Sequence, residues 1–173
     1  MDRLIRAAST ADRDAVQSLI RREVARGTVL PRAFTPDDFL VMEEDGCVVG
    51  TLALTPWSDG VTELGTIIAA RPGLGIGSAL LSAGAAEAQR RGADRVVVLT
   101  ASPGFFARAG FSASADPPWA RARGPVLLQD PDEALQSAIS TKASSSCRRC
   151  PKLARCRQHL LTRALAPADR AVA

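Results

Sequence analysis

Apolar positions along the chain follow two different periods, and the change of period marks the predicted elements. Between residues 15 and 24 apolar side chains recur at helical spacing, and Gly27 ends the run. The same reasoning predicts a second helix over about residues 77–91, which Gly92 ends. A short third helix is expected in the segment "SPGFFARAGF", closing on Gly110.

Shorter apolar runs, several of them rich in β-branched residues, predict strands. They occupy residues 4–8, two runs within 39–54, residues 61–70, residues 95–101 and a segment near Val126. The two runs within 39–54 flank Asp45 and Gly46, a pair typical of a tight hairpin turn. Three successive hairpin-type strands before the second helix do not fit a dinucleotide-binding unit, in which strands alternate with helices.

The segment "RPGLGIGSALL", residues 71–81, places three glycines in five residues directly before the second helix. Its G-x-G-x-G spacing differs from the G-x-G-x-x-G of dinucleotide-binding proteins, and it lacks the lysine of a triphosphate-binding loop. Two interpretations stay open. Either its backbone N–H groups and the helix N-terminus hold an anion such as a diphosphate, or the loop is a tight turn without a ligand.

The chain of 173 residues is long enough for one domain with a sizeable core and a small appendage. With 46% hydrophobic residues and a mean hydropathy of +0.03, the composition is that of a globular protein and not of a disordered one. No apolar run approaches the roughly 18 residues that span a bilayer, and the start "MDRLIR" lacks the apolar segment of a signal peptide. We therefore expect a cytoplasmic protein with no membrane partner.

Charge is unevenly distributed between the body of the chain and its C-terminal segment. The formal net charge is +4, but from Lys142 onward eight basic residues stand against one acidic residue, which gives +7 there and leaves −3 for the rest. The polar stretch "STKASSS" opens this segment, so we expect a main domain at 1–140 and a basic, cysteine-rich segment at 141–173. A basic segment can attract nucleic acid, but a solvated arginine-rich face is the favoured interpretation.

Three of the four cysteines and the only histidine lie in the basic segment, as C-x₂-C-x₅-C-x₂-H. Reduced thiols clustered in this way indicate a metal site more than disulfides. Four such ligands suit tetrahedral zinc, and three thiolates also suit an iron–sulfur cluster, whereas cysteines without a metal are the alternative. The residues concerned are Cys147, Cys150, Cys156 and His159. Cys47, in a predicted strand, is expected to be a small buried hydrophobic residue.

The glycine loop, the strand "TELGTIIAA" before it, the strand "RVVVLT" after it and the segment "FFARAGF" together resemble the GNAT superfamily of acetyl-CoA-dependent N-acetyltransferases. The resemblance implies an α/β fold with a mixed, largely antiparallel sheet flanked by helices, to which this chain adds a small C-terminal cysteine module. The acyl-CoA loop of the family has the form Q/R-x-x-G-x-G/A. Gly75 and Gly77 match it, whereas Pro72 stands in place of the Gln or Arg and Arg71 lies one residue earlier. The implied acetyl-CoA-binding residues are Ile68, Ala69, Arg71, Gly73, Gly75, Ile76, Gly77, Ser78 and Phe106.

Two further motifs, "VLPR" at 29–32 and "CRRCPKLARC" at 147–156, resemble the short stand-alone amino-acid N-acetyltransferases of the N-acetylglutamate synthase type. This narrower resemblance implies acetyl transfer to the α-amine of glutamate or a similar small amino acid, the first step of arginine biosynthesis. Arg32 is the expected substrate-binding residue, because a guanidinium forms a bidentate contact with a carboxylate. The alternative is a surface arginine that caps a proline turn.

In acetyl transfer an amine attacks a thioester, an oxyanion forms and a thiolate leaves. Backbone N–H groups from Ile67 to Ala69 are candidates to stabilise the oxyanion, and Glu63 is the candidate base, acting through a water. Glu63 can equally be a solvent-facing carboxylate on a strand. Phe106 stands where many GNAT enzymes have a tyrosine, and the chain has no tyrosine at all. A thiol with a pKa of about 8.5 leaves near neutral pH without a strong acid.

Sparse acid–base chemistry favours an α-amine, with a pKa near 8, over a lysine side chain, with a pKa near 10.4, as the acceptor. Two other functions fit the sequence: a GNAT enzyme for a different small amine, and a degenerate acyl-CoA-binding regulator whose metal-binding tail contacts nucleic acid or a partner. We expect a small-molecule amino-acid substrate and no nucleic-acid partner, and a homodimer is left open.

Overall fold

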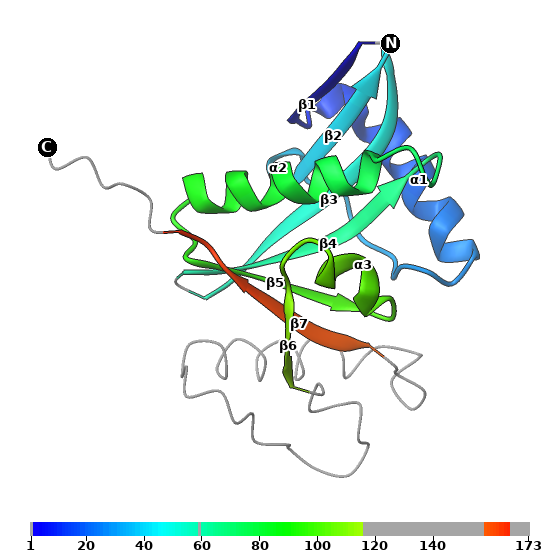
Figure 1. The fold of residues 1–173 in the computed structure, drawn as a ribbon. Helices are drawn as coiled ribbons and strands as arrows, with labels where there is room; N and C mark the ends of the chain where they lie inside the picture. The colour runs from blue at the N-terminus through cyan, green and yellow to red at the C-terminus, as the bar shows by residue number, and fades with distance from the viewer. Residues whose placement is uncertain (1, 59, 116–157, 167–173) are drawn as a thin grey trace, which may run out of the picture. The chain divides into compact units, whose positions relative to one another are not determined.

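The computed structural model describes residues 2–58, 60–115 and 158–166 (Figure 1). The chain forms two units and passes between them within two adjacent strands and within one helix. Unit 1 comprises Met1–Thr55 and Leu64–Glu87, and unit 2 comprises Pro56–Glu63 and Ala88–Ala173. Strands β3 (Cys47–Ser58) and β4 (Val61–Ala69) therefore contribute residues to both units, and so does helix α2 (Ile76–Arg90).

Unit 1 is built on antiparallel strands. β1 (Arg3–Ala7) pairs with β2 (Phe39–Glu44), and β2 pairs with β3, whose other neighbour is β4. Asp45 and Gly46 join β2 to β3 with φ values of 49° and 80°. Both residues are thus left-handed, as in the tight hairpin turn that the Asp-Gly pair predicts.

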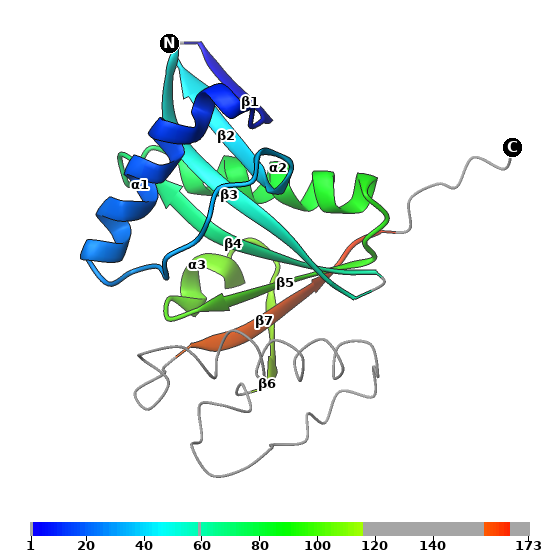
Figure 2. The same ribbon diagram turned by 180° about the vertical axis from the view of Figure 1, so that it is seen from behind.

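Two helices cover opposite faces of the unit 1 strands. α2 (Ile76–Arg90) lies in front of the strands in Figure 1, and α1 (Arg13–Ala25) lies in front of them in Figure 2. A Cβ atom on Gly50 of β3 would lie 2.6 Å from Ile76, and one on Gly84 of α2 would lie 2.8 Å from Leu52. Glycine at these two positions therefore permits α2 to pack directly on β3.

The α1 face of unit 1 carries a hydrophobic core to which helix, loop and strands all contribute. Its buried members are Val16, Leu19, Ile20, Phe34, Phe39, Val41, Ala53 and Ile68. The three members on α1 lie at the helical spacing seen in the sequence. A short 3₁₀ turn, Thr10–Asp12, leads into α1, and another, Pro36–Asp38, leads into β2.

Unit 2 contains the start of β4, β5 (Arg95–Thr100), α3 (Pro103–Ala107), β6 (Ser112–Ala115) and β7 (His159–Ala164). The start of β4 pairs with β5 in parallel, with Glu63 opposite Val97. β7 lies between β5 and β6 and is antiparallel to both. Leu160 and Leu161 of β7 are buried, so this late segment of the chain completes the unit 2 strands.

The elements predicted between residues 4 and 110 are present, and the expected mixed, largely antiparallel sheet flanked by helices is confirmed. Strands β6 and β7 were not predicted. The predicted strand near Val126, the boundary near residue 140 and the cysteines at 147–156 lie outside the described residues. The prediction that Cys47 is buried was wrong: it is exposed, because it is the first residue of β3, next to the hairpin turn. No helix among the described residues has the length and apolarity needed to cross a membrane.

Candidate active site

The glycine loop leads directly into the N-terminus of α2. Gly73 and Gly75 have φ values of +83° and +77°, which residues with a side chain rarely adopt. A Cβ atom on either glycine would meet nothing within 4 Å, so the outer side of the loop is open. The N–H of Ala79 donates to the carbonyl of Gly75 at 3.0 Å, which starts the helical ladder. The amides of residues 76–78 precede that ladder, and with the helix dipole they can bind an anion.

Arg71, at the start of the loop, pairs with the carboxylate of Glu44 at the end of β2. Nε of Arg3 donates to the same carboxylate at 2.9 Å, and Nη1 of Arg3 donates to the carbonyl of Leu74 at 3.0 Å. Arg71 was predicted from the sequence as a cofactor-binding residue, but its partners were not. The contacts of Glu44 with Arg3 and Arg71 depend on the pairing of β1 with β2.

β4 contains a residue in the left-handed region, Thr66, with a φ of 49°. A β-branched residue in this conformation inside a strand is unusual, and such residues accompany bulges that redirect the backbone. Thr66 directly precedes Ile67–Ala69, the residues predicted to offer N–H groups to an oxyanion. The one sequence signal for this irregularity was Gly65, a glycine inside a strand.

A pocket of about 190 Å³ lies beside this part of β4, within unit 1. It is lined by Glu23, Arg26, Thr28, Val29, Ile67, Ile68, Ala69 and Pro72. The pocket thus brings three predicted residues of β4 together with the glycine loop at Pro72 and with the last turn of α1. The α1 side was not predicted, because helical periodicity marks only the apolar face of that helix.

The α1 side of the pocket is charged and internally hydrogen-bonded. Nη1 of Arg26 lies 2.9 Å from Oε1 of Glu23, and Oγ1 of Thr28 donates to Oε2 of Glu23 at 2.7 Å. The hydrogen bond from Thr28 is the main cause that lowers the pKa of Glu23, and the nearby charge of Arg26 adds to it against the opposing effect of burial. The pocket therefore has a fixed negative charge and a fixed positive charge on one wall.

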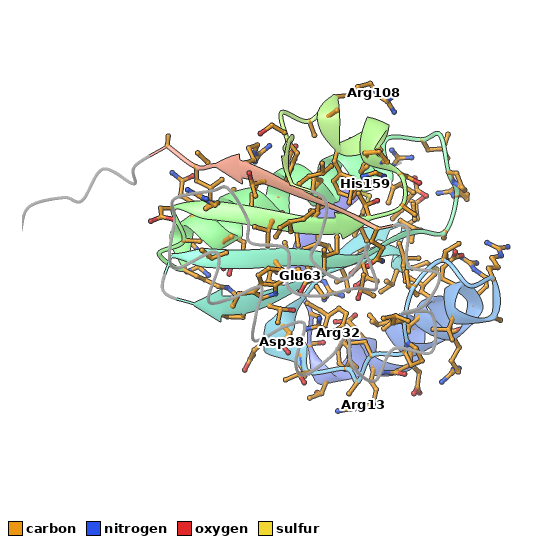
Figure 3. All side chains as sticks on the ribbon, turned by 90° about the horizontal axis from the view of Figure 1, so that it is seen from below. Arg13, Arg32, Asp38, Glu63, Arg108 and His159 are labelled. Carbon is orange, nitrogen blue, oxygen red and sulfur yellow. The ribbon has the colours of Figure 1, made fainter. Side chains whose placement is uncertain are left out.

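Glu63, the predicted base, lies near the start of β4 in unit 2 and is labelled in Figure 3. It is 7% exposed, so it is not a solvent-facing carboxylate. Nε1 of Trp57 donates to Oε2 of Glu63 at 2.7 Å. The indole therefore fixes one oxygen of a buried carboxylate, a contact that the sequence did not predict.

Arg32 lies in the loop between α1 and β2, with Asp38 beside it (Figure 3). Its Nη1 donates to Oγ1 of Thr55 at 2.8 Å, and its Nη2 lies 3.7 Å from a carboxylate oxygen of Asp38. The guanidinium carbon lies 5.4 Å from the centroid of the Phe39 ring. Arg32 is thus held by three side chains of unit 1, and it is not among the residues that line the pocket.

Phe106, on α3, is buried in an aromatic cluster of unit 2. Its ring centroid lies 4.9 Å from that of Phe105 and 5.8 Å from that of Phe111, both in edge-to-face arrangement. The cluster has a packing role, and a contact of Phe106 with a cofactor stays a prediction.

The described residues contain no group of three or more histidine, cysteine and acidic side chains that could hold a metal. His159 is the exposed first residue of β7, opposite Thr100 of β5. Its three expected co-ligands, Cys147, Cys150 and Cys156, lie outside the described residues. The metal site therefore stays a prediction.

The chain was compared with protein families and with curated proteins. The Acetyltransferase (GNAT) family matches residues 10–111, which is more than half of the chain and includes the glycine loop. The search of curated proteins found no match.

Many solved structures share the fold. N-acetylglutamate synthase from Neisseria gonorrhoeae, complexed with coenzyme A and N-acetyl-glutamate, is 20% identical with a TM-score of 0.69, and the match covers 96% of this chain and 36% of that one. Rv2747 from Mycobacterium tuberculosis, in complex with CoA, is 25% identical with a TM-score of 0.72, and the match covers 94% of this chain and 99% of that one. The putative acetyltransferase yncA from Salmonella typhimurium, with acetyl-CoA, is 20% identical with a TM-score of 0.63 and coverage of 98% and 99%. The chain therefore spans about a third of the Neisseria protein and nearly all of the other two.

Proposed function

Because the chain belongs to the acetyltransferase (GNAT) family, we propose that it is an acetyl-CoA-dependent N-acetyltransferase whose acceptor is the α-amine of glutamate or a similar small amino acid. One observation carries the proposal. The open glycine loop presents the free amides of the α2 N-terminus, and Pro72 of the same loop lines a pocket with Ile67–Ala69.

The loop supplies what a CoA diphosphate needs. Left-handed glycines let the phosphates approach the main chain, and the amides of residues 76–78 donate to them with the support of the helix dipole. The pocket beside Ile68 and Ala69 offers room for the pantetheine arm. The solved structures with CoA or acetyl-CoA noted above support this assignment by fold.

Acetyl-CoA supplies a thioester whose C–S bond breaks as the acceptor nitrogen forms a C–N bond to the acetyl carbon, and CoA leaves as the thiolate. Backbone N–H groups of Ile67–Ala69 stabilise the charge that develops on the carbonyl oxygen. Glu63 takes the proton of the amine through a water. The hydrogen bond from Trp57 orients the Glu63 carboxylate for this transfer. CoA can leave as the thiolate near neutral pH without a proton from an acid of the chain, because a thiol has a pKa of only about 8.5.

Arg32 would bind the carboxylate of the acceptor. Its contacts with Thr55 and Asp38 fix the guanidinium in advance, so little side-chain entropy is lost on binding. Similarity to an N-acetylglutamate synthase structure supports this acceptor class. The same contacts favour a second candidate, an acceptor without a carboxylate. Asp38 already provides Arg32 with a carboxylate partner, and Arg32 does not line the pocket.

Release of thiol from acetyl-CoA, measured with each amino acid and with matched amines that lack a carboxylate, tests the proposal. We expect turnover with glutamate or a similar amino acid, and mass spectrometry should find the acetyl group on its α-nitrogen. Turnover only with the carboxylate-free amines would favour the second candidate. Tight CoA binding without turnover of any acceptor would instead favour the acyl-CoA-binding regulator.

A metal held by Cys147, Cys150 and Cys156, with His159 as a fourth ligand for zinc, remains part of the proposal. Elemental analysis of the purified chain, with Cys150→Ser as the control, should find zinc or iron in the wild type and less in the variant. A wild type without metal would contradict it. A cytoplasmic location and a role in arginine biosynthesis rest on the sequence and on the acceptor proposed here.

A further inference from the structure

We propose that Glu44 is a positioning residue for the glycine loop. Through Arg3 and Arg71 it holds the loop in its binding conformation and keeps the guanidinium of Arg71 beside the cofactor's diphosphate. This inference rests on the proposed use of acetyl-CoA.

The Glu44 carboxylate is buried and has a separate partner for each oxygen. Its side chain is 5% exposed, Oε1 accepts from Nε of Arg3 at 2.9 Å, and Oε2 pairs with Nη2 of Arg71. A buried carboxylate is costly unless it is paired, and loss of one partner leaves that cost uncompensated. Glu44 therefore fixes both guanidinium groups in place.

Arg3 ties the loop at a second point. Its Nη1 donates to the carbonyl of Leu74 at 3.0 Å, and Leu74 stands between the two left-handed glycines. Glycines lose more conformational freedom on ordering than other residues, so a loop of this kind is costly to order when the ligand arrives. The ties at Arg71 and Leu74 order the loop beforehand, and this is how Glu44 strengthens binding.

Arg71 also supplies charge. Two guanidinium groups share one carboxylate, which leaves a net positive charge beside the loop. The Arg71 side chain is 44% exposed and Glu44 engages its Nη2, and a guanidinium has further N–H groups with which it can donate to a phosphate. Pro72 stands where the family has Gln or Arg. Arg71, held by Glu44, takes over that contact from one position earlier.

The adjacent residue of β2 provides a matched control. Glu43 pairs with Nη2 of Arg6 at 2.8 Å, and the same arginine binds Asp12 before α1. Glu43 and Glu44 are thus neighbouring glutamates on one strand, each paired with an arginine of β1. Only Glu44 is tied to the glycine loop.

The test is a set of CoA titrations by calorimetry on the full chain, with wild type, Glu44→Gln, Glu44→Asp, Arg71→Ala, the double variant Glu44→Gln/Arg71→Ala and Glu43→Gln. We expect Glu44→Gln and Arg71→Ala each to weaken CoA binding about tenfold. The double variant should be weaker than either because the Arg3 route is also lost, but by less than the product of the two single losses. Glu44→Asp, which keeps the charge, should restore part of the loss. Glu43→Gln should bind within about twofold of wild type. At saturating acetyl-CoA, kcat should stay near wild type in Glu44→Gln while KM for acetyl-CoA rises.

CoA binding by Glu44→Gln equal to that of wild type would overturn the inference. So would a double variant whose loss of affinity equals the product of the two single losses, because the two residues would then act independently. If Glu44→Gln does not fold, Glu44→Asp takes its place with Arg71→Ala and their double variant, and the expected loss and coupling are then smaller because aspartate keeps the charge. A wild type that binds no CoA would remove the proposed function itself. The two failures are therefore distinct.

Discussion

The indole nitrogen of Trp57 lies 2.7 Å from Oε2 of Glu63, and the carboxylate that accepts this hydrogen bond is almost fully buried. Replacing Glu63 by Gln should keep the contact with Trp57 and remove the base. We expect kcat to fall by about 10²- to 10⁴-fold, with KM for acetyl-CoA little changed. Steady-state kinetics of Glu63→Gln test this.

Trp57→Phe provides the comparison for Glu63→Gln. It keeps the base and removes the orienting hydrogen bond, so kcat should fall less than in Glu63→Gln. An unchanged kcat in Glu63→Gln would show that Glu63 is a structural carboxylate.

Arg32 and Arg13 each place a guanidinium carbon 5.4 Å from the centroid of a phenylalanine ring, Phe39 and Phe34 respectively. Arg32→Ala should raise KM for a carboxylate acceptor by about 10- to 100-fold, because a charge-assisted contact is lost. Arg13→Ala, the matched control, should leave KM nearly unchanged. Arg32→Lys should not restore the bidentate contact. Equal effects of Arg32→Ala on acceptors with and without a carboxylate would contradict the assignment.

Gly75 and Gly46 have nearly the same φ, +77° and +80°, and a Cβ on either would meet nothing within 4 Å. Alanine at either position should therefore cause similar backbone strain, about 1–2 kcal/mol, and a similar loss of thermal stability. Only Gly75→Ala disturbs the loop, so it alone should weaken CoA binding, by about tenfold. Thermal unfolding and CoA titration of both variants give the answer. Equal CoA binding by the two would contradict a role for the loop.

Asp12 connects the start of α1 to β1. Hydrogen bonds from Arg6 are the main cause that lowers the pKa of Asp12, and Ser9 adds to it against the effect of burial. Because the pKa is lower in the folded state, the ionised group stabilises the fold above its ordinary pKa of about 4, and this contribution is lost as the pH falls toward the lowered folded value. Asp12→Asn should therefore cost about 2–3 kcal/mol of unfolding free energy at neutral pH.

The difference between wild type and Asp12→Asn should shrink below about pH 4, where the wild type also loses the charge. Asp14→Asn, at an exposed aspartate in the first turn of the same helix, is the control and should change little. Urea unfolding across the pH range measures both. A difference that persists unchanged at low pH would contradict the ionic account.

The sequence was sufficient to predict those elements that are determined by residues close together in the chain. The Asp45–Gly46 turn and the helical spacing of Val16, Leu19 and Ile20 each follow from a few adjacent residues. Strand β7 could not be predicted in this way, because the burial of Leu160 and Leu161 depends on insertion between two distant strands.

The same limit applies to the candidate site. The glycine loop and the β4 residues are contiguous in sequence and were predicted. The contact between Glu44 and Arg71 arises only when separate elements pack. Glu23 and Arg26 are neighbours on one helix, but they become the wall of a pocket only where the end of α1 lies beside β4. Cys47 was predicted to be buried because it lies in an apolar run, but it is exposed. The sequence of such a run does not reveal which of its end residues is exposed to solvent.

Titration of CoA into the folded full chain tests the central claim most directly, because every role proposed for the loop presumes that its amides bind the diphosphate. We predict saturable binding of about one CoA per chain. Free pantetheine, which lacks the phosphates, should bind with lower affinity. Absence of heat with CoA, or equal affinity for CoA and pantetheine, in protein shown to be folded would contradict the account.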